Sequence, residues 1–268
     1  MARVKQAGTI EVRGLRKVFQ QAGTGERVVA IERLDFDVTQ GELVAVVGQT
    51  GCGKSTFLNL LIGLDRPTEG RITIGGRAPY EDFDHFRGVL AAVFQQDRLL
   101  PWRTALDNVR LPLELLGRDP AEQLARARAW LDRLGLARFE RAYPHELSGG
   151  MRQRVALARA FVVEPALLLA DEAFGHLDEV TAAALRQTFV DLARTEGYTA
   201  ILVTHQLEEA IDMGGRILVF GRPGRVLADI DLRAWPAASV SGLRGDIQRM
   251  LQSNAPDPRF TQAVKERA

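Results

Sequence analysis

The sequence of 268 residues contains one cysteine and no long uninterrupted apolar run. Because Cys52 has no partner, an intramolecular disulfide is excluded, and a reducing, cytoplasmic compartment is expected. A membrane-spanning helix needs about 18 consecutive apolar residues, which occur nowhere, and residues 1–10 lack the apolar core of a secretory signal. We therefore expect any contact with a membrane to be made through another protein.

An excess of charge of either sign is also missing. The 35 Lys and Arg residues nearly balance the 34 Asp and Glu residues, which gives a net charge of +1. Binding to a nucleic-acid backbone depends on a basic surface, so the composition does not support a nucleic-acid partner. Apolar residues make up 46% of the chain, enough to bury a substantial core.

Two apolar patterns predict a mixed sheet. Alternation at Leu34, Phe36 and Val38, and again at Ile72 and Ile74, predicts half-buried antiparallel edge strands. Continuous apolar runs are typical of parallel strands buried on both faces, with helices on both sides. Such runs occupy Leu43–Val47, Val89–Phe94, Leu167–Ala170 and Ala200–Val203.

A helical insertion is expected inside this α/β core, over residues 97–160. Thr104–Leu116 forms a predicted helix, and Pro120–Leu134 forms another, with Asp119 as N-cap and Gly135 as stop. We expect residues 1–220 to form one domain and residues 221–268 a C-terminal extension. The extension begins with a turn and continues as a weak strand and a polar, helix-compatible tail.

The strongest motif follows the apolar run that ends at Val47. It matches G-x-x-x-x-G-K-[ST] and comprises Gly48, Gln49, Thr50, Gly51, Cys52, Gly53, Lys54, Ser55 and Thr56. In such a P-loop, backbone N–H groups and a helix N-terminus bind phosphate, the lysine reaches the β- and γ-phosphates, and the serine ligates Mg²⁺. We expect a nucleotide site here, with Cys52 as a bystander; a reactive thiol is the alternative.

Two further segments carry groups for the same chemistry. Asp171 and Glu172 end an apolar run, where Asp171 suits Mg²⁺ and Glu172 suits polarisation of an attacking water, although alone they could mark an ordinary strand end. Ser148, Gly149 and Gly150 open a predicted helix that continues to about Val163, with Ser148 as N-cap. This second anion-binding helix start could equally be an ordinary cap, and a single nucleotide cannot obviously use both helix starts of one subunit.

The order of these motifs resembles the ABC ATPase family over about residues 10–220. The family's signature is Leu-Ser-Gly-Gly-Gln, from which Met151 departs at the last position. The resemblance implies a P-loop NTPase (RecA-like) fold with an antiparallel edge subdomain and a helical subdomain. It also implies ATP and Mg²⁺ as ligands and a head-to-tail homodimer in which Ser148 of one copy meets the phosphate held by the other.

The resemblance assigns further residues by position. Gln95, with Gln96 as the alternative, matches the glutamine that approaches Mg²⁺, and His205 matches the histidine that contacts the γ-phosphate. Asp178 matches an acid that crosses the dimer interface. Phe19 resembles the aromatic residue that stacks on adenine, although a Phe in an early strand is often a core residue.

Two positions depart from the family near Glu172. Ala173 stands where proline is usual, which could loosen the loop that positions water and slow hydrolysis without affecting nucleotide binding. His176 stands where alanine or serine is usual, and could make activity sensitive to pH between about 5 and 8.

The stretch Leu99–Val109, with Pro101 and Trp102, and the later Arg222–Arg225 resemble the ATPases of nitrate, sulfonate and taurine importers. The Pro-Trp turn could seat a membrane permease or could reflect local packing. We expect a peripheral subunit on the cytoplasmic face of the bacterial inner membrane, served indirectly by an extracytoplasmic solute-binding protein. The alternatives are an exporter or lipid-trafficking ATPase and, outside transport, an ABC ATPase that remodels DNA or ribosomes.

Overall fold

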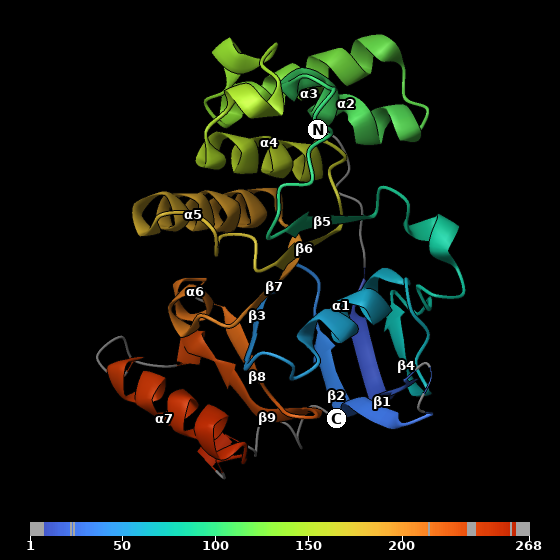
Figure 1. The fold of residues 1–268 in the computed structure, drawn as a ribbon, viewed down its shortest axis with the longest axis vertical. Coiled ribbons are helices and arrows are strands. Elements are labelled where there is room, and N and C mark those ends of the chain that lie inside the picture. The colour runs from blue at the N-terminus through green and yellow to red at the C-terminus, as the bar shows by residue number, and fades with distance from the viewer. Residues whose placement is uncertain are drawn as a thin grey trace. The chain divides into compact units, whose positions relative to one another are not determined.

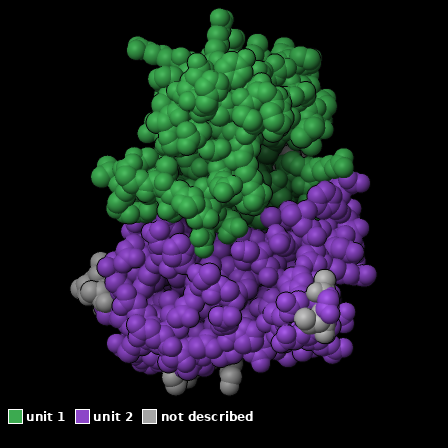
Figure 2. Space-filling view, in the orientation of Figure 1, with its two compact units in different colours: residues 1–6, 85–198 green, residues 7–84, 199–268 purple. Residues whose placement is uncertain are grey.

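The computed structural model describes residues 8–21, 23, 25–213, 215–234, 240–257 and 259–260. They belong to two compact units, which Figure 2 colours separately. Unit 1 contains residues 85–198, and unit 2 contains the described residues of 7–84 and 199–268. These boundaries differ from the expected helical insertion at 97–160 and extension at 221–268, and that finer division stays a prediction.

The N-terminal part of unit 2 is antiparallel, as predicted. Strand β1 (Ile10–Gln20) pairs on one side with β2 (Arg27–Val38) and on the other with β4 (Glu69–Ile74). Leu34, Phe36 and Val38 alternate with more exposed residues and are buried. The period-two pattern therefore identified both the strand and its buried face.

The parallel part of unit 2 centres on β3 (Leu43–Gly48). It pairs in parallel with β7 (Thr199–Thr204) and β8 (Arg216–Gly221), and every residue of these three strands is buried. Strand β9 (Gly224–Asp231) pairs with β8 in the antiparallel sense and with β2 in parallel. Burial on both faces explains why β3 and β7 appear in the sequence as continuous apolar runs.

The α-helices of the described part of unit 2 lie around these strands (Figure 1). They are α1 (Lys54–Ile62), α6 (Leu207–Asp212) and α7 (Val240–Ser253), and the 3-10 turn η4 spans Leu232–Ala234. Phe57 of α1 packs against Phe36 of β2 and Phe220 of β8, with ring centroids 5.6 and 5.8 Å away. This aromatic cluster fixes α1, and therefore the loop before it, against the strands.

Unit 1 combines two parallel strands with helices. Strand β5 (Leu90–Phe94) pairs with β6 (Leu167–Asp171). The predicted strand began at Val89 and was expected to be buried on both faces, yet β5 begins at Leu90 and only Val93 is fully buried. The reason is that residues of β5 line an open groove, described below, which leaves one face partly uncovered.

The predicted helices of unit 1 begin within one residue of their expected starts; Thr104, expected as the first residue of a helix, is its N-cap instead. Thr104 caps α2 (Ala105–Leu115), and Asp119 caps α3 (Pro120–Arg133) by accepting from the Ala121 and Glu122 amides. Helix α4 (Gly149–Phe161) ends two residues before the predicted end at Val163. The remaining elements are α5 (Glu179–Glu196) and the 3-10 turns η1 (Phe83–Phe86), η2 (Ala137–Phe139) and η3 (Pro144–Glu146).

Thr104→Ala is expected to lower the free energy of unfolding by about 1 kcal/mol, the usual effect of losing an N-cap. The Thr104 hydroxyl accepts from the Asp107 amide at 3.2 Å and donates to the Asp107 carboxylate at 2.7 Å. Urea denaturation measures the change. Thr104→Ser keeps the hydroxyl and serves as control; equal stability of the alanine and serine variants would contradict the capping role.

Candidate nucleotide site

The predicted P-loop leaves β3 at Gly48 and enters α1 at Lys54, within unit 2. Gly51 and Gly53 have φ angles of 78° and 96°, in the left-handed region that favours glycine. A Cβ on Gly53 would lie 2.6 Å from the carbonyl oxygen of Ala30 in β2. Glycine is therefore required at position 53 both by backbone conformation and by the closeness of β2.

Lys54 is held beneath the loop. Its side chain is only 6% exposed, and its Nζ donates to the carbonyl oxygens of Gly48 at 2.6 Å and Gln49 at 3.1 Å. No ion pair joins Lys54 to a carboxylate in the described part of the chain. The positive charge is therefore positioned by neutral groups and remains available to an anion.

The start of α1 completes an anion-binding cradle. Among the described residues, no hydrogen-bond acceptor is found for the amides of Gly51 and Gly53, and the first turn of α1 contains no acidic residue. Thr50, Ser55 and Thr56 belong to the same loop and first turn. Unpaired N–H groups at a helix N-terminus favour phosphate, so these residues fit a nucleotide.

Cys52 is part of the loop's framework. Its backbone N–H donates to the Gln49 carbonyl oxygen, and its side chain is buried. Burial raises the pKa of the Cys52 thiol, although the charge of Lys54 opposes the change. Since the thiolate is the reactive form, the structure favours the bystander interpretation over a reactive thiol.

His205 follows β7 at the same edge from which the P-loop leaves β3. The two strands are parallel, and Val47 of β3 is in register with Thr204 of β7. The Thr204 hydroxyl donates to Glu209 at 2.5 Å and accepts from the Gln206 amide at 2.9 Å, which fixes the turn around His205. The exposed His205 ring is therefore presented at the carboxyl edge of the strands.

Phe19 lies on an exposed part of β1 with its side chain 40% accessible. It is opposite Val28 of β2, and Lys17 Nζ lies 4.7 Å from the ring centroid. Val28 is two residues from Ala30, the residue in β2 that borders Gly53. Phe19 is thus an exposed aromatic surface near the P-loop rather than a core residue.

In unit 1, Asp171 and Gln95 lie at the carboxyl ends of adjacent strands. Asp171 ends β6 and is in register with Phe94 of β5, so Gln95 and Glu172 leave the pair at the same edge. Glu172 has a φ angle of 48°, unusual for a residue with a side chain. Such strained conformations persist only where the surroundings enforce them, and they are often found at active sites.

Gln153 of α4 joins these two loops, a role the sequence did not reveal. Its buried Nε2 donates to the Ala173 carbonyl oxygen at 2.6 Å and to the Phe94 carbonyl oxygen at 3.3 Å. Ala173 is itself buried. The loop after Glu172 is therefore anchored by Gln153 although position 173 is not a proline. In the sequence, the only sign of this role is a polar residue on a predicted helix.

Ser148 caps α4 (Gly149–Phe161), as predicted, by accepting from the Met151 amide at 3.3 Å. A Cβ on Gly150 would lie 2.8 Å from Thr181 of α5, so only glycine fits closely there. The helix start opens into a pocket of about 360 Å³ lined also by Arg154 and His176. A helix N-terminus that opens into a pocket beside an arginine is suited to an anion.

Asp178 caps α5 by accepting from the Thr181 amide at 3.0 Å. Hydrogen bonds from Thr181 hold the pKa of Asp178 below its usual value. This local role is compatible with the predicted position at a dimer interface, since the side chain is exposed.

We expect His176→Ala to leave the pH profile of ATPase activity between about pH 5 and 8 unchanged. His176 is exposed and lines two open pockets, where solvent moderates the effect of its charge. Rates measured for wild type and variant across this range should superimpose. A shifted or flattened profile in the variant would instead assign His176 a role in the cycle.

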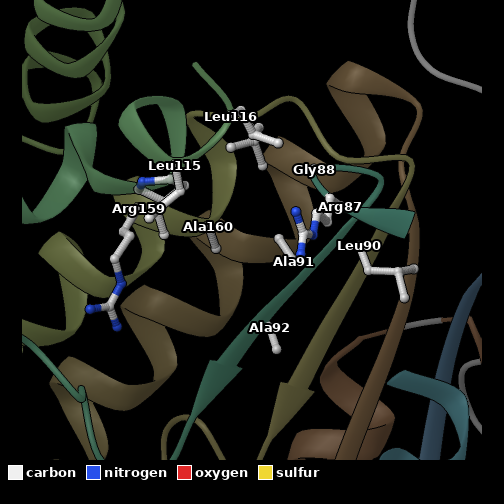
Figure 3. A pocket seen from close by; sticks show the side chains of 11 residues that line it. Arg87, Gly88, Leu90, Ala91, Ala92, Leu115, Leu116, Arg159 and Ala160 are labelled. Carbon is white, nitrogen blue, oxygen red and sulfur yellow. The ribbon is translucent and has the colours of Figure 1, made fainter. Parts of the chain in front are cut away.

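A separate groove of about 500 Å³ crosses unit 1. Figure 3 shows its lining from α2, α4 and β5, including Leu115, Leu116, Ala160 and Ala91. Leu115 is 78% exposed, and Trp102, just before α2, is 71% exposed. Tryptophan in particular is enriched at protein interfaces, where an apolar ring meets a polar surface.

The predicted residues thus form two sets, one in each unit. The P-loop, Phe19 and His205 belong to unit 2, whereas Gln95, Ser148, Asp171, Glu172 and Asp178 belong to unit 1. No helix in the described ranges combines the length and apolar composition needed to cross a membrane.

Known proteins match the chain over most of its length. A taurine import ATP-binding protein from Rhizobium johnstonii is 44% identical, covering 80% of this chain and 81% of that protein. An aliphatic sulfonates import ATP-binding protein from Rhodopseudomonas palustris is 40% identical, covering 92% and 85%. A solved dimer of the ATP-binding cassette MJ0796 with ADP and Pi is similar at 33% identity and a TM-score of 0.73, covering 84% of this chain and all of that one.

The solved cassettes confirm the predicted fold class. A second dimeric MJ0796 structure matches with 34% identity and a TM-score of 0.74. The model of the ABC transporter family matches residues 31–175, which include the P-loop, Ser148, Asp171 and Glu172. The chain belongs to the ABC transporter family, as one of its ATPases.

Proposed function

We propose that this ATPase powers the import of taurine or a related aliphatic sulfonate through a separate membrane permease. The observation that carries the energy-coupling part is the buried Lys54 beneath a loop in which the Gly51 and Gly53 amides are unpaired. The similarity to taurine and sulfonate import proteins supports the solute class and the direction of transport. It favours import over the exporter and non-transport alternatives.

Each residue of the site has a defined task in this proposal. Lys54 and the loop amides bind the β- and γ-phosphates, and Phe19 stacks on adenine. Glu172 orients the attacking water, and His205 contacts the γ-phosphate. Ser55, Gln95 and Asp171 offer the oxygen ligands that Mg²⁺ prefers, and bound Mg²⁺ neutralises the charge of the phosphates.

Two copies of the chain are proposed to form the active species. Ser148 and the amides of Gly149 and Gly150 form a second anion-binding helix start, with Asp178 nearby in the same pocket. In a head-to-tail dimer this helix start meets the phosphate bound by the partner's P-loop. The similarity to dimeric ATP-binding cassettes supports the arrangement.

The permease is proposed to bind α2 of unit 1, at the cytoplasmic face of the membrane. Trp102 precedes the helix, and Leu115 and Leu116 line the groove at its other end. The 71% exposure of Trp102 favours a partner contact over the local packing that the sequence left open. An extracytoplasmic solute-binding protein would act through the permease and does not touch this chain.

Trp102→Ala is expected to weaken capture of the permease at least about tenfold, as for an aromatic residue central to an interface. Detergent-solubilised permease titrated against immobilised ATPase measures the affinity. Phe139→Ala removes another exposed aromatic side chain of unit 1, outside α2, and should leave capture unchanged. If both variants lost permease affinity equally, the loss would reflect the removal of any exposed aromatic side chain and not a specific contact of Trp102.

The solute assignment is tested with the ATPase, its permease and binding protein in liposomes. Taurine or an alkanesulfonate, presented with the binding protein outside, should stimulate ATP hydrolysis and enter the vesicles. Accumulation in the opposite direction would indicate export. Failure of a permease to co-purify, together with binding to DNA or ribosomes, would favour a non-transport ATPase.

A further inference from the structure

The C-terminal helix α7 contacts the P-loop although the two are far apart in sequence. Gln49, the first residue of the loop after β3, donates from its side-chain Nε2 to the carbonyl oxygen of Leu251, at 2.9 Å. The backbone carbonyl oxygen of the same Gln49 accepts from Lys54 Nζ at 3.1 Å. A chain of two hydrogen bonds therefore links α7 to the phosphate-binding lysine.

A second contact lies at the end of α7. Asn254 donates from Nδ2 to the Arg222 carbonyl oxygen at 2.6 Å, and its Oδ1 accepts from the Arg222 amide at 2.7 Å. Arg225 Nη2 donates to the Asn254 carbonyl oxygen at 2.9 Å. The side-chain amide of Asn254 thus makes two hydrogen bonds with the backbone of Arg222, one as donor and one as acceptor, as a neighbouring strand would.

Arg222 lies beside the tip of the loop. Gly48 is in register with Phe220 of the parallel strand β8, so residues 49–51 and 221–222 leave the strands at the same edge. A Cβ on Gly51 would lie 3.7 Å from the Arg222 guanidinium carbon. No ion pair with a described carboxylate involves Arg222, so its charge faces the loop without a fixed counterion.

Helix α7 is well anchored in unit 2. Leu243, Ile247 and Met250 recur at helical spacing and are buried, which places one apolar face of the helix inward. Asn254 has a φ angle of 50°, the left-handed conformation that ends many helices and that asparagine tolerates. The contacts with Gln49 and Arg222 are therefore made by an element with its own packing.

We propose that α7 is a positioning element of the nucleotide site, which holds Gln49 and Arg222 so that Lys54 and the loop tip are ordered for phosphate. The inference rests on the nucleotide site described under Proposed function. Gln49 and Asn254 act through Lys54 and Arg222, and so they are positioning residues. Ordering a loop before binding lowers the entropic cost of binding, so the effect falls mainly on nucleotide affinity.

Two variants remove the contacts from opposite sides. Gln49→Leu deletes the donor to Leu251, and Asn254→Gly deletes both side-chain bonds while tolerating the positive φ. Each should raise the KM for ATP about three- to tenfold, the effect of losing one or two neutral hydrogen bonds, and change kcat less than about twofold. Asn254→Asp keeps the acceptor for the Arg222 amide and should give an intermediate KM.

Gln252→Leu is the matched control, because Gln252 is exposed on the same helix and its side chain has no hydrogen bond in the described structure. A purely structural role of α7 would lower Tm in the two variants and leave KM near that of wild type, which would overturn the inference. Wild type that neither binds nor hydrolyses ATP would instead overturn the proposed function.

Hydrogen exchange of wild type gives a test that needs no variant. If docked α7 favours nucleotide, bound nucleotide must favour docked α7 by the same factor. A non-hydrolysable ATP analogue should therefore slow exchange of the amides of residues 243–253 about three- to tenfold. Identical exchange of α7 with and without the analogue would contradict the coupling even where ATP hydrolysis is normal.

Discussion

Lys54→Ala is expected to abolish detectable nucleotide binding and to lower kcat/KM for ATP by at least about 10²-fold, the effect of losing a charged group that stabilises the transition state. Lys54 is buried beneath the loop and points between the Gly48 and Gln49 carbonyl oxygens. Alanine would remove the cation that these two oxygens hold in place for an anion. Titration with a fluorescent ATP analogue and steady-state ATPase assays measure both effects.

Lys54→Arg is the matched control for charge. The guanidinium keeps the positive charge but is larger and planar, so it should restore part of the binding and little of the turnover. The unfolding midpoint of each variant separates loss of ligand from loss of fold. If Lys54→Ala bound the ATP analogue with wild-type affinity, neither this lysine nor the P-loop could be part of the nucleotide site.

Glu172→Gln is expected to keep ATP binding and to reduce turnover about 10²- to 10⁴-fold, the usual contribution of a general base. The amide retains the size of the carboxylate but cannot accept a proton from water. Because hydrolysis then no longer ends the closed state, ATP should hold two copies together as a dimer. Rapid-quench assays measure turnover, and light scattering with and without ATP measures the dimer.

Glu81→Gln provides the control, because Glu81 is exposed and belongs to no ion pair in the described chain. It should match wild type in rate and in oligomeric state. Turnover of Glu172→Gln at the wild-type rate would remove Glu172 from its assigned role. If Glu172→Gln stayed strictly monomeric in saturating ATP, this would contradict the proposal that the P-loop of one copy and the Ser148 helix start of the other bind the same phosphate.

Signals that are local in sequence predicted the structure best. Asp119 and Ser148 each cap the helix expected of them, because a cap depends only on the next three residues. The P-loop likewise combines a strand, glycines and a helix start within one short segment. The runs Leu43–Val47 of β3 and Ala200–Val203 of β7 were recognisable because burial on both faces leaves these stretches without a polar residue.

Contacts between distant segments were not predictable from one sequence. Gln49 and Leu251 are separated by 202 positions, and no pattern in either segment indicates the other. Gln153 looked like one polar residue among several at a helix start, yet its side chain joins two loops. The partial exposure of β5 likewise depends on the absence of a covering element over one of its faces, and the pattern of apolar residues in the strand contains no information on that.

The order of strands in unit 2 has a consequence for synthesis on the ribosome. The central strand β3 is made early, but its two neighbours, β7 and β8, are made only with residues 199–221. Until then the apolar residues of β3 have no parallel partner, whereas residues 85–198 are already complete and can collapse locally. Residues 43–48 of the nascent chain therefore have no parallel partner until residues 199–221 are made, and during that interval this apolar strand is open to non-native pairing.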